Sequence, residues 1–208
     1  MNDGAAVRRG DEAIEAPAAP AVIIRPTIPG DVDAILAIYS HHISRGVDPT
    51  AMHDVEAAEP EDLKRRRKNF RDKRLPHLAA VLGGEVIGYA YAVQFRKRPA
   101  YRYTVKHSIY IHPDHQRAGL GRRLLPALID ACAVAGYRQM IGYIDAANAA
   151  SLRLHDTCGF RQVGFLPSVG YKFGKWSDVV MVQRSLGPGA GAPADVWAFP
   201  EGANGAGA

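Results

Sequence analysis

The chain has 208 residues and a formal net charge of +5, with 47% hydrophobic and 23% charged residues, as expected of one soluble globular domain long enough to bury a core. Its two cysteines, Cys132 and Cys158, are too far apart for a C-x-x-C pair. Their positions argue against a disulfide framework or a metal site and favour the reducing cytoplasm. The sequence shows neither an apolar run of membrane-spanning length nor the apolar segment of a secretory signal. The positive charge suits an anionic ligand without by itself indicating nucleic acid.

Two tails are expected to flank one folded unit. Residues 1–21 and 187–208 are rich in Ala, Pro and Gly, and such segments bury too little apolar surface to offset the entropy lost on ordering, so both are predicted to be disordered. Hydrophobic periodicity and turn residues place the folded unit at 22–186. In chain order it is predicted to hold a strand at 22–25, helices at about 31–39 and 60–74, strands at 77–82, 86–95 and 101–111, a helix at 119–135, a strand at 140–144, a helix at 149–158, and strands at 160–166 and 179–183. This order predicts an α/β fold with a mixed sheet and helices on both faces.

A glycine-containing loop at 116–121, Gln-Arg-Ala-Gly-Leu-Gly, is the most informative motif. It lies between a predicted strand and a predicted helix. Glycines at 119 and 121 remove Cβ atoms where the backbone would approach a ligand closely, and the free N–H groups that begin a helix favour an anion. The loop fits neither G-x-x-x-x-G-K-[ST] nor G-x-G-x-x-G, because Leu124 stands where a third glycine would be needed. It therefore predicts an anion-binding loop of another kind, with an ordinary strand-to-helix turn as the alternative.

Together with further blocks of sequence, this loop resembles the GNAT superfamily of N-acetyltransferases, in its phosphinothricin and methionine-sulfoximine acetyltransferase branch. The segment 44–60 lacks the branch's usual Phe-containing substrate segment. The resemblance implies a GNAT-type mixed, mostly antiparallel central sheet with helices on both faces, acetyl-CoA as co-substrate, no metal, and a homodimer. The matching blocks cover most of the folded unit and lie at 88–91, 95–102, 104–111, 112–115, 116–121, 148–151, 154–155, 159–160 and 170–178.

The resemblance also implies which residues bind acetyl-CoA. The backbone of Ile109, Tyr110 and Ile111 would line the pantetheine arm, and the Ile111 N–H could polarise the thioester carbonyl. Asn148 stands just before a predicted helix, so it is expected to cap that helix and, by resemblance, to contact the cofactor as well. The pyrophosphate would bind main-chain N–H groups and arginines of the loop at Arg117, Ala118, Gly119, Leu120, Gly121 and Arg122.

Two residues are candidates for catalysis, His155 and Lys106. His155 occupies the position where much of the superfamily has a tyrosine that protonates the leaving sulfur, and a packed core histidine is the alternative. Lys106 stands where many branch members have a glutamate regarded as the general base. A lysine can be a base only if its pKa is lowered toward neutrality, and it could instead bind a substrate carboxylate, leaving His155 or water to take the proton. The adjacent His107 cannot simply replace that glutamate, because consecutive side chains on a strand point to opposite faces.

The substrate of the branch is an amino acid, whose carboxylate needs a cationic partner. For the basic residues just after the predicted strand at 86–95, a solvated loop is the alternative. A denser run of basic residues at 64–68 is interpreted as a solvated helix face, so neither nucleic acid nor membrane is expected as a partner. The residues expected to approach a small-molecule amine substrate are Arg96, Lys97, Arg98, Lys106, His107 and Ser108.

The predicted function is acetyl-CoA-dependent N-acetylation of a small amino acid or analogue, of the phosphinothricin, methionine sulfoximine or methionine sulfone type. Two alternatives stay open. One is acetylation of a protein N-terminus or lysine. The other is a regulatory acyl-CoA-binding domain without turnover, which the missing glutamate makes plausible.

Overall fold

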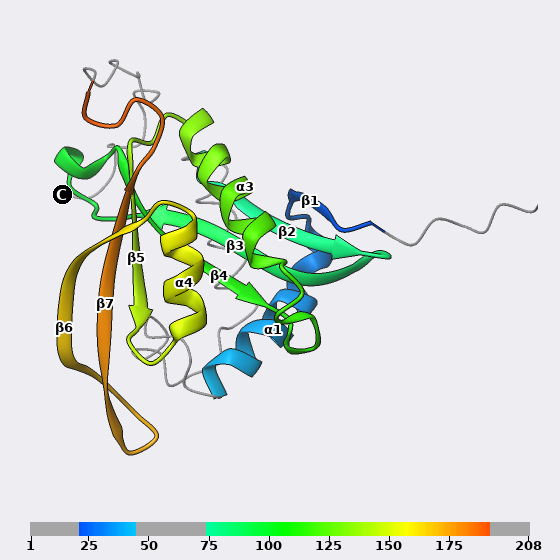
Figure 1. Cartoon of the computed structure of the whole chain (residues 1–208). Coiled ribbons are helices and arrows are strands. Elements are labelled where there is room, and N and C mark those ends of the chain that lie inside the picture. The colour runs from blue at the N-terminus through cyan, green and yellow to red at the C-terminus, as the bar shows by residue number, and fades with distance from the viewer. Residues whose placement is uncertain (1–20, 45–73, 192–208) are drawn as a thin grey trace, which may run out of the picture.

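A seven-stranded sheet forms the centre of the molecule (Figure 1). The computed structural model describes residues 21–44 and 74–191. The strand order is β1-β2-β3-β4-β5-β7-β6, in which β4 and β5 run parallel and every other neighbouring pair is antiparallel. The predicted mixed, mostly antiparallel sheet is thereby confirmed. The strands are β1 (Ile23–Pro26), β2 (His77–Leu82), β3 (Glu85–Gln94), β4 (Thr104–Ile111), β5 (Gln139–Asp145), β6 (Arg161–Lys172) and β7 (Lys175–Ser185).

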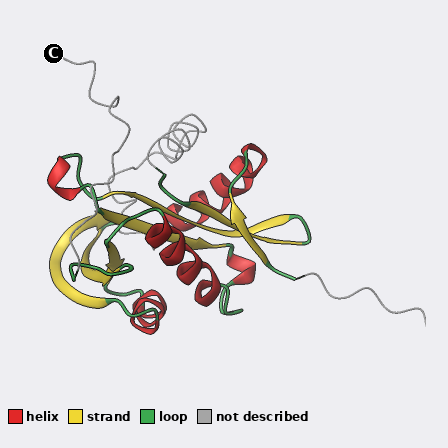
Figure 2. Cartoon of the chain, turned by 90° about the horizontal axis from the view of Figure 1, so that it is seen from above, coloured by secondary structure: helices red, strands yellow, loops and turns green. Residues whose placement is uncertain are grey.

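Helices cover both faces of this sheet (Figure 2). On one face α1 (Val32–Ser44) buries Ile38 and Tyr39 against Tyr89 and Tyr110 of the sheet. The other face is covered by α3 (Gly121–Val134) and α4 (Ala149–Thr157). The apolar side chains of α3 recur at helical spacing, as the sequence predicted, and join the larger core. The residues that α3 buries are Leu124, Leu125, Leu128, Ile129 and Cys132.

The parallel pair β4–β5 is short, and this opens the sheet at its centre. The two strands are paired only from Thr104 and Gln139 to Lys106 and Ile141. Beyond that point β4 stays paired with β3, whereas β5 stays paired with β7. The two strands therefore separate from residues 107 and 142 onward, and backbone groups on their facing edges are left for another partner.

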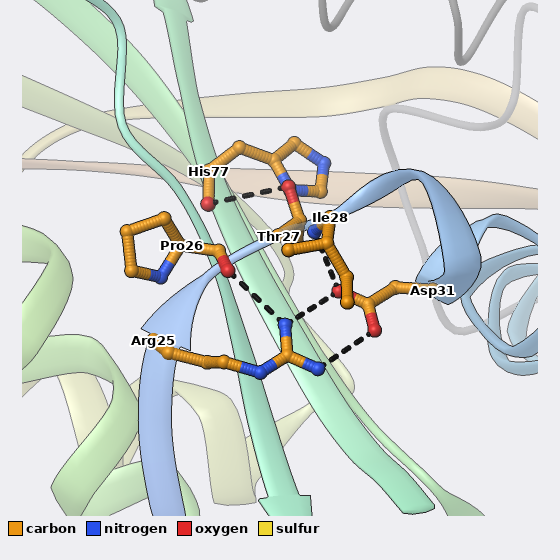
Figure 3. Close-up of polar contacts among 6 residues, drawn as sticks. All are labelled: Arg25, Pro26, Thr27, Ile28, Asp31 and His77. Atoms are coloured by element: carbon orange, nitrogen blue, oxygen red, sulfur yellow. Dashed lines mark hydrogen bonds and ion pairs between the residues drawn. The ribbon is translucent and has the colours of Figure 1, made fainter.

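An ion pair ties the beginning of α1 to strand β1 (Figure 3). The Arg25 guanidinium donates to both carboxylate oxygens of Asp31, at 2.7 and 2.9 Å, and the Ile28 N–H donates to the same carboxylate at 2.8 Å. Asp31 is buried, so these hydrogen bonds offset the cost of removing its charge from water. Its position just before α1 also places a negative charge at the positive end of the helix dipole.

The last two strands extend beyond the ranges predicted from the sequence, 160–166 and 179–183. Pro167 and the glycines nearby interrupt the alternation of apolar and polar residues that predicts a strand. The strand nevertheless continues, because its pairing with β7 shifts register at two places, between Gln162 and Gly164 and between Leu166 and Gly170. The hairpin closes at Phe173 and Gly174, both with positive φ, as tight antiparallel turns require. The prediction that these strands end early was wrong because bulges let a strand continue past residues that would otherwise break it.

Other boundaries agree closely, with two exceptions. The first helix, predicted at about 31–39, continues to Ser44. A short 3-10 turn, Pro99–Tyr101, precedes β4 where a continuous strand from 101 was predicted. The predicted helix at 60–74, the charge run at 64–68 and most of both predicted tails lie outside the described residues. Within 21–44 and 74–191, no helix combines the length and apolarity needed to cross a membrane.

Candidate active site

A cavity of about 880 Å³ lies where β4 and β5 separate. Its wall combines the end of α1, the second half of β4, the 115–122 loop with the start of α3, the second half of β5, and α4. Elements that are far apart in the sequence therefore meet at the gap in the sheet. The gap supplies unpaired strand edges, and α3 supplies a helix N-terminus, so one cavity offers hydrogen-bond donors to both an amide-rich chain and an anion.

The 116–121 loop adopts backbone conformations that favour glycine. Gly119 has a φ of +77°, and Arg117 has a φ of +61°, which is uncommon for a residue with a Cβ. The loop leads into α3 at Gly121, where an added Cβ would lie 2.9 Å from a methyl of Leu154 on α4. Gly121 thus permits α3 and α4 to approach closely, while the left-handed loop places the N-terminus of α3 on the cavity wall.

Strand β4 directs alternate amide groups into the gap. The His112 N–H donates to Ile87 O on the β3 side, at 2.9 Å. Because N–H directions alternate along a strand, the N–H groups of Ile109 and Ile111 point the other way, toward the side from which β5 has withdrawn. The carbonyl of Ile111 on that side accepts a hydrogen bond from His42 Nε2 at 2.8 Å. The N–H groups of Ile109 and Ile111 are thereby directed into the gap, whereas the Ile111 carbonyl already has His42 as its partner.

Asn148 caps α4. Its Oδ1 accepts a hydrogen bond from the Ser151 N–H at 3.0 Å, and its side chain also lies on the cavity wall. The expected N-cap role is confirmed by this contact. The cap fixes the first turn of α4, which carries Ser151 and, one turn later, His155.

Two buried histidines meet at the apex of the gap. His107 of β4 and His155 of α4 lie with their Nε2 atoms 2.9 Å apart, and both side chains line the cavity. The other nitrogen of each ring faces a backbone carbonyl: His107 Nδ1 is 3.1 Å from Ile141 O, and His155 Nδ1 is 2.8 Å from Ser151 O. The Ser151 hydroxyl is a further neighbour of His155 Nδ1, at 3.3 Å.

The surroundings of the pair are apolar and tightly packed. The ring of Phe160 lies 5.1 Å from both imidazoles, measured between ring centroids. Gly142 of β5 faces His107, and a Cβ at that position would lie 2.9 Å from both His107 Cε1 and a methyl of Val182. Gly142 is therefore the residue that makes room for His107.

Burial keeps both imidazoles neutral near pH 7. Desolvation and, to a smaller extent, the neighbouring His155 lower the pKa of His107 to about 3, against the opposing effect of the Ile141 carbonyl. Desolvation likewise lowers the pKa of His155, and the Ser151 carbonyl opposes this shift. As both nitrogens of His155 face protein groups, a neutral His155 presents no free N–H to a ligand sulfur.

The structure separates the sequence-predicted site residues into two groups. Ser108, Ile109, Tyr110 and Ile111 line the cavity with His107 and His155, as do Asn148 and the loop residues Arg117, Gly119, Leu120, Gly121 and Arg122. Lys106 does not line it, and neither do Arg96, Lys97 and Arg98 or the loop residue Ala118.

The residues outside the cavity have other surroundings. The Arg96 guanidinium lies over the rings of Phe95 and Tyr101, and Lys97 and Arg98 are exposed. Lys106 is half-buried at the last paired position of β4 and β5, and by strand alternation it is on the face that carries Tyr110 and α1. His107 is on the opposite face, as predicted.

Several cavity residues were missed by the sequence analysis. His41 and His42, at the end of α1, reach the cavity, and so do Gly142 and Asp145 of β5. Asp145 is buried and accepts hydrogen bonds from the Ala147 N–H and the Ser177 hydroxyl. Their spacing gives no signal in a single sequence, because only the order of the strands brings α1 and β5 to one cavity.

The profile of the Acetyltransferase (GNAT) family matches residues 41–160 of this sequence. The chain belongs to this family. It is an N-acetyltransferase. The segment 104–134, which forms β4, the loop and α3, both carries part of the sequence resemblance and lines the cavity at the gap between β4 and β5.

Relatives of this GNAT enzyme extend the match to about four fifths of the chain. It is 43% identical over 170 residues to the phosphinothricin N-acetyltransferase of Alcaligenes faecalis, covering 81% of this chain and 85% of the relative. It is 37% identical over 175 residues to the L-methionine sulfoximine/L-methionine sulfone acetyltransferase of Pseudomonas aeruginosa, covering 82% and 98% of the two chains.

Solved structures of acetyltransferases are similar to this chain as well. A GNAT superfamily phosphinothricin acetyltransferase from Sinorhizobium meliloti, determined in complex with acetyl-CoA, superposes with a TM-score of 0.81 at 33% identity, covering 87% of this chain and 97% of that one. The yncA protein of Salmonella typhimurium, determined with its cofactor acetyl-CoA, has a TM-score of 0.77 at 36% identity, covering 83% and 98%.

Proposed function

We propose that this GNAT enzyme transfers the acetyl group of acetyl-CoA to the amino group of a small amino acid or analogue, of the phosphinothricin, methionine sulfoximine or methionine sulfone type. The observation that carries the proposal is the cavity that runs from the N-terminus of α3 to the apex of the gap between β4 and β5. The α3 end suits the pyrophosphate of acetyl-CoA, and the gap between β4 and β5 suits its pantetheine arm and thioester. The names of the relatives from Alcaligenes faecalis and Pseudomonas aeruginosa support the choice of acceptor.

Each part of the cavity would have a role in binding acetyl-CoA. The N–H groups at the start of α3, with Arg117 and Arg122, would bind the pyrophosphate. The exposed edge of β4 would pair with the amides of the pantetheine arm, and the Ile111 N–H would donate to the thioester oxygen as negative charge develops there. Asn148 would contact the same arm from the start of α4.

A panel of amines tests the acceptor class. We expect thiol release from acetyl-CoA in the presence of phosphinothricin, methionine sulfoximine or methionine sulfone, measured with a thiol reagent. Release only with peptides would instead indicate a protein or peptide acetyltransferase. Acetyl-CoA binding by calorimetry, without turnover on any amine, would indicate a regulatory acyl-CoA-binding domain and contradict the proposal.

Lys106 is proposed to bind the carboxylate of the amino-acid substrate. Acetyl-CoA would reach the gap from the side of α3 and α4, so the acceptor amine has to approach from the opposite face, where α1 lies. Lys106 is on that face, at the position where β4 and β5 begin to separate. A lysine needs no unusual pKa to bind a carboxylate, whereas it would need one to act as a base.

Replacing Lys106 with methionine, which keeps most of the side-chain length, is therefore expected to raise KM for amino acids by about tenfold or more, as loss of one charge-assisted hydrogen bond predicts. KM for a matched amine without the carboxylate should change little. Steady-state kinetics with both substrates measures the difference. An equal fall in kcat for both substrates would instead assign Lys106 as the base, and an equal, small effect would remove both roles.

We also propose that the protein is a cytoplasmic homodimer. The β6–β7 hairpin supports a second copy as the partner, because it exposes large apolar side chains that a monomer would leave in water. Sedimentation should give the dimer mass for the native chain and the monomer mass after Trp176→Glu, and a native monomer would contradict the proposal. The exposed apolar residues of the hairpin are Val163, Phe165, Val169, Tyr171, Phe173 and Trp176.

A further inference from the structure

We propose that His107 and His155 act as a single proton-holding unit in the transfer reaction, with the Ser151 hydroxyl as the route by which the proton enters and leaves. This inference rests on the proposed function, because it assigns the proton transfers of that reaction. It adds a residue, His107, to the catalytic chemistry and gives His155 a role that it cannot have alone. It also names the base of an enzyme whose Lys106 replaces the usual glutamate.

Counting protons shows why the two rings form a unit. The pair makes three close contacts through its four ring nitrogens: His107 Nδ1 with Ile141 O at 3.1 Å, Nε2 with Nε2 at 2.9 Å, and His155 Nδ1 with Ser151 O at 2.8 Å. A carbonyl only accepts, so each of the two outer contacts needs a hydrogen on the histidine, and the central contact needs one more. The three contacts thus need three protons, whereas two neutral imidazoles carry two. The arrangement is complete only when the pair holds one extra proton.

Two neutral imidazoles leave two ring nitrogens without a hydrogen. When the central hydrogen bond is formed, one of them is its Nε2 acceptor, and the structure favours His155 Nδ1 as the other, the vacant nitrogen. A vacancy at His107 Nδ1 would face the Ile141 carbonyl inside the sheet, where the described residues offer no donor to fill it. A vacancy at His155 Nδ1 has the Ser151 hydroxyl 3.3 Å away, and this hydroxyl can donate into it. In the resting state His107 therefore carries its hydrogen on Nδ1, and His155 carries its hydrogen on Nε2 and donates it to His107.

The vacancy is also the part of the pair that a substrate can reach. His155 and His107 are 3% and 6% exposed, but Ser151 is half-buried and lines the cavity beside them. A proton that arrives at the Ser151 oxygen can displace the hydroxyl hydrogen onto His155 Nδ1. The Ser151 carbonyl, 2.8 Å from that nitrogen, then accepts the new N–H and completes the third contact.

The transfer reaction supplies this proton and consumes it. Attack of a neutral amine on the thioester carbonyl forms a C–N bond and a tetrahedral adduct with a positively charged nitrogen. The pair takes one proton from that nitrogen through Ser151. When the C–S bond breaks, the thiolate receives the same proton by the same route, so that the amide and the free thiol of coenzyme A are both neutral. The pair ends as it began, and no external acid or base is needed for this step.

Burial makes the pair suitable for both halves of the cycle. It keeps the resting pair uncharged, so that a lone pair is available near neutral pH, and it makes the charged pair a strong acid toward a thiolate. Charged and titratable groups around the same cavity will modulate its proton affinity. Those that line the cavity within the described residues, besides the pair itself, are His41 and His42 of α1, Tyr110 of β4, His115, Arg117, Arg122 of α3, Tyr143 and Asp145 of β5, and Arg153 and Asp156 of α4.

Two substitutions of His107 test whether it shares the proton or only positions His155. In His107→Gln the amide oxygen can still accept the hydrogen bond from His155 Nε2, but an amide takes up no proton near neutral pH. In His107→Phe the hydrogen bond is lost as well. If the pair shares a proton, both variants should lower kcat by about 100-fold, the usual size of an acid–base contribution, with little change in acetyl-CoA affinity by calorimetry. His112→Asn is the matched control, because His112 lies outside the cavity and an asparagine retains an acceptor for the Asp114 N–H.

The outcomes separate the possibilities. Native kcat in His107→Gln with a loss in His107→Phe would reduce His107 to a positioning residue and overturn the proposal, as would native kcat in both. Loss in both, with an unchanged His112→Asn control, supports it. Ser151→Ala should also lower kcat, by less, since a water molecule can replace the hydroxyl.

Nitrogen NMR of the full-length native chain, labelled at histidine, gives a readout that is independent of turnover. We expect His107 to carry its hydrogen on Nδ1 and His155 on Nε2 at neutral pH, and both rings to respond together to the uptake of one proton on acidification. The opposite tautomers, or two rings that titrate independently, would overturn the proposal. Failure of the native enzyme to acetylate any amine would refute the proposed function, whereas turnover that survives His107→Gln would refute only the shared proton.

Discussion

Replacing Gly119 with tryptophan is expected to abolish acetyl-CoA binding while the protein stays folded. Gly119 lies on the cavity wall with a φ of +77°, and an added Cβ would meet no atom within 4 Å. The indole would then occupy open space beside the N-terminus of α3, which is the space proposed for the pyrophosphate. The left-handed conformation adds a cost of about 1–2 kcal/mol, which a domain of ordinary stability tolerates. Calorimetry with acetyl-CoA, and thermal unfolding followed by circular dichroism, measure the two effects.

Gly83→Trp is the matched control for this variant. Gly83 also has a positive φ, +57°, and open space around its Cβ position, but it lies in the turn between β2 and β3, outside the cavity. It carries the same backbone cost and should leave acetyl-CoA affinity unchanged. Gly121 is less suitable, because its substitution would press on Leu154 and disturb the packing of α3 against α4. Undiminished affinity in a folded Gly119→Trp variant would contradict the proposed pyrophosphate site.

The order and type of the described elements could be predicted from the sequence, because each depends on local signals. Leu124, Leu125 and Leu128 recur at the period of a helix, and Gly83–Gly84 marks a hairpin between two apolar strands. The length of β6 and β7 could not be predicted in this way. The continuation of β6 past Pro167 depends on bulges in its pairing with β7. These bulges form because β7 supplies hydrogen bonds on either side of each irregularity.

The loop that lines one end of the cavity was also visible in the sequence, since Gly119 and Gly121 stand between a predicted strand and a predicted helix. The histidine pair was not, although both of its members were named. Strand alternation correctly placed His107 on the face opposite Lys106, but it gives no information on what that face contacts. His107 and His155 meet only because β4 and β5 separate, and α4 lies over the gap, which are long-range features of the sheet order. Their roles, and that of Lys106, stay predictions.

Taken together, the two faces of the gap divide the proposed chemistry. Acetyl-CoA would bind on the side of α3 and α4, where the histidine pair lies, and the acceptor would approach Lys106 from the side of α1. A lysine in place of the usual glutamate is then consistent with turnover, because the proton is handled on the other face of the sheet.

Gly142→Ala is expected to lower kcat by about 100-fold and to destabilise the fold by about 1–3 kcal/mol, the usual cost of adding atoms to a packed core. The new Cβ would lie 2.9 Å from His107 Cε1 on one side and 2.9 Å from a Val182 methyl on the other. Neither neighbour is the free end of a flexible side chain. His107 is held by Ile141 O and by His155, and Val182 is buried in the core, so the imidazole must move and its contact with His155 must lengthen.

Gly164→Ala provides the matched comparison, because Gly164 is also a sheet glycine but its added Cβ would meet the Met181 sulfur at 3.3 Å, and a methionine side chain adjusts easily. That variant should keep native kcat and nearly native stability. Unfolding in denaturant measures the stability of both variants, and steady-state kinetics at saturating acetyl-CoA measures kcat. The loss of stability and the loss of kcat in Gly142→Ala can be measured separately. At temperatures where the variant is fully folded, His107 would still be displaced, so kcat should stay low. Native kcat in a folded Gly142→Ala variant would show that the distance between His107 and His155 does not matter for the reaction, which would contradict the shared proton.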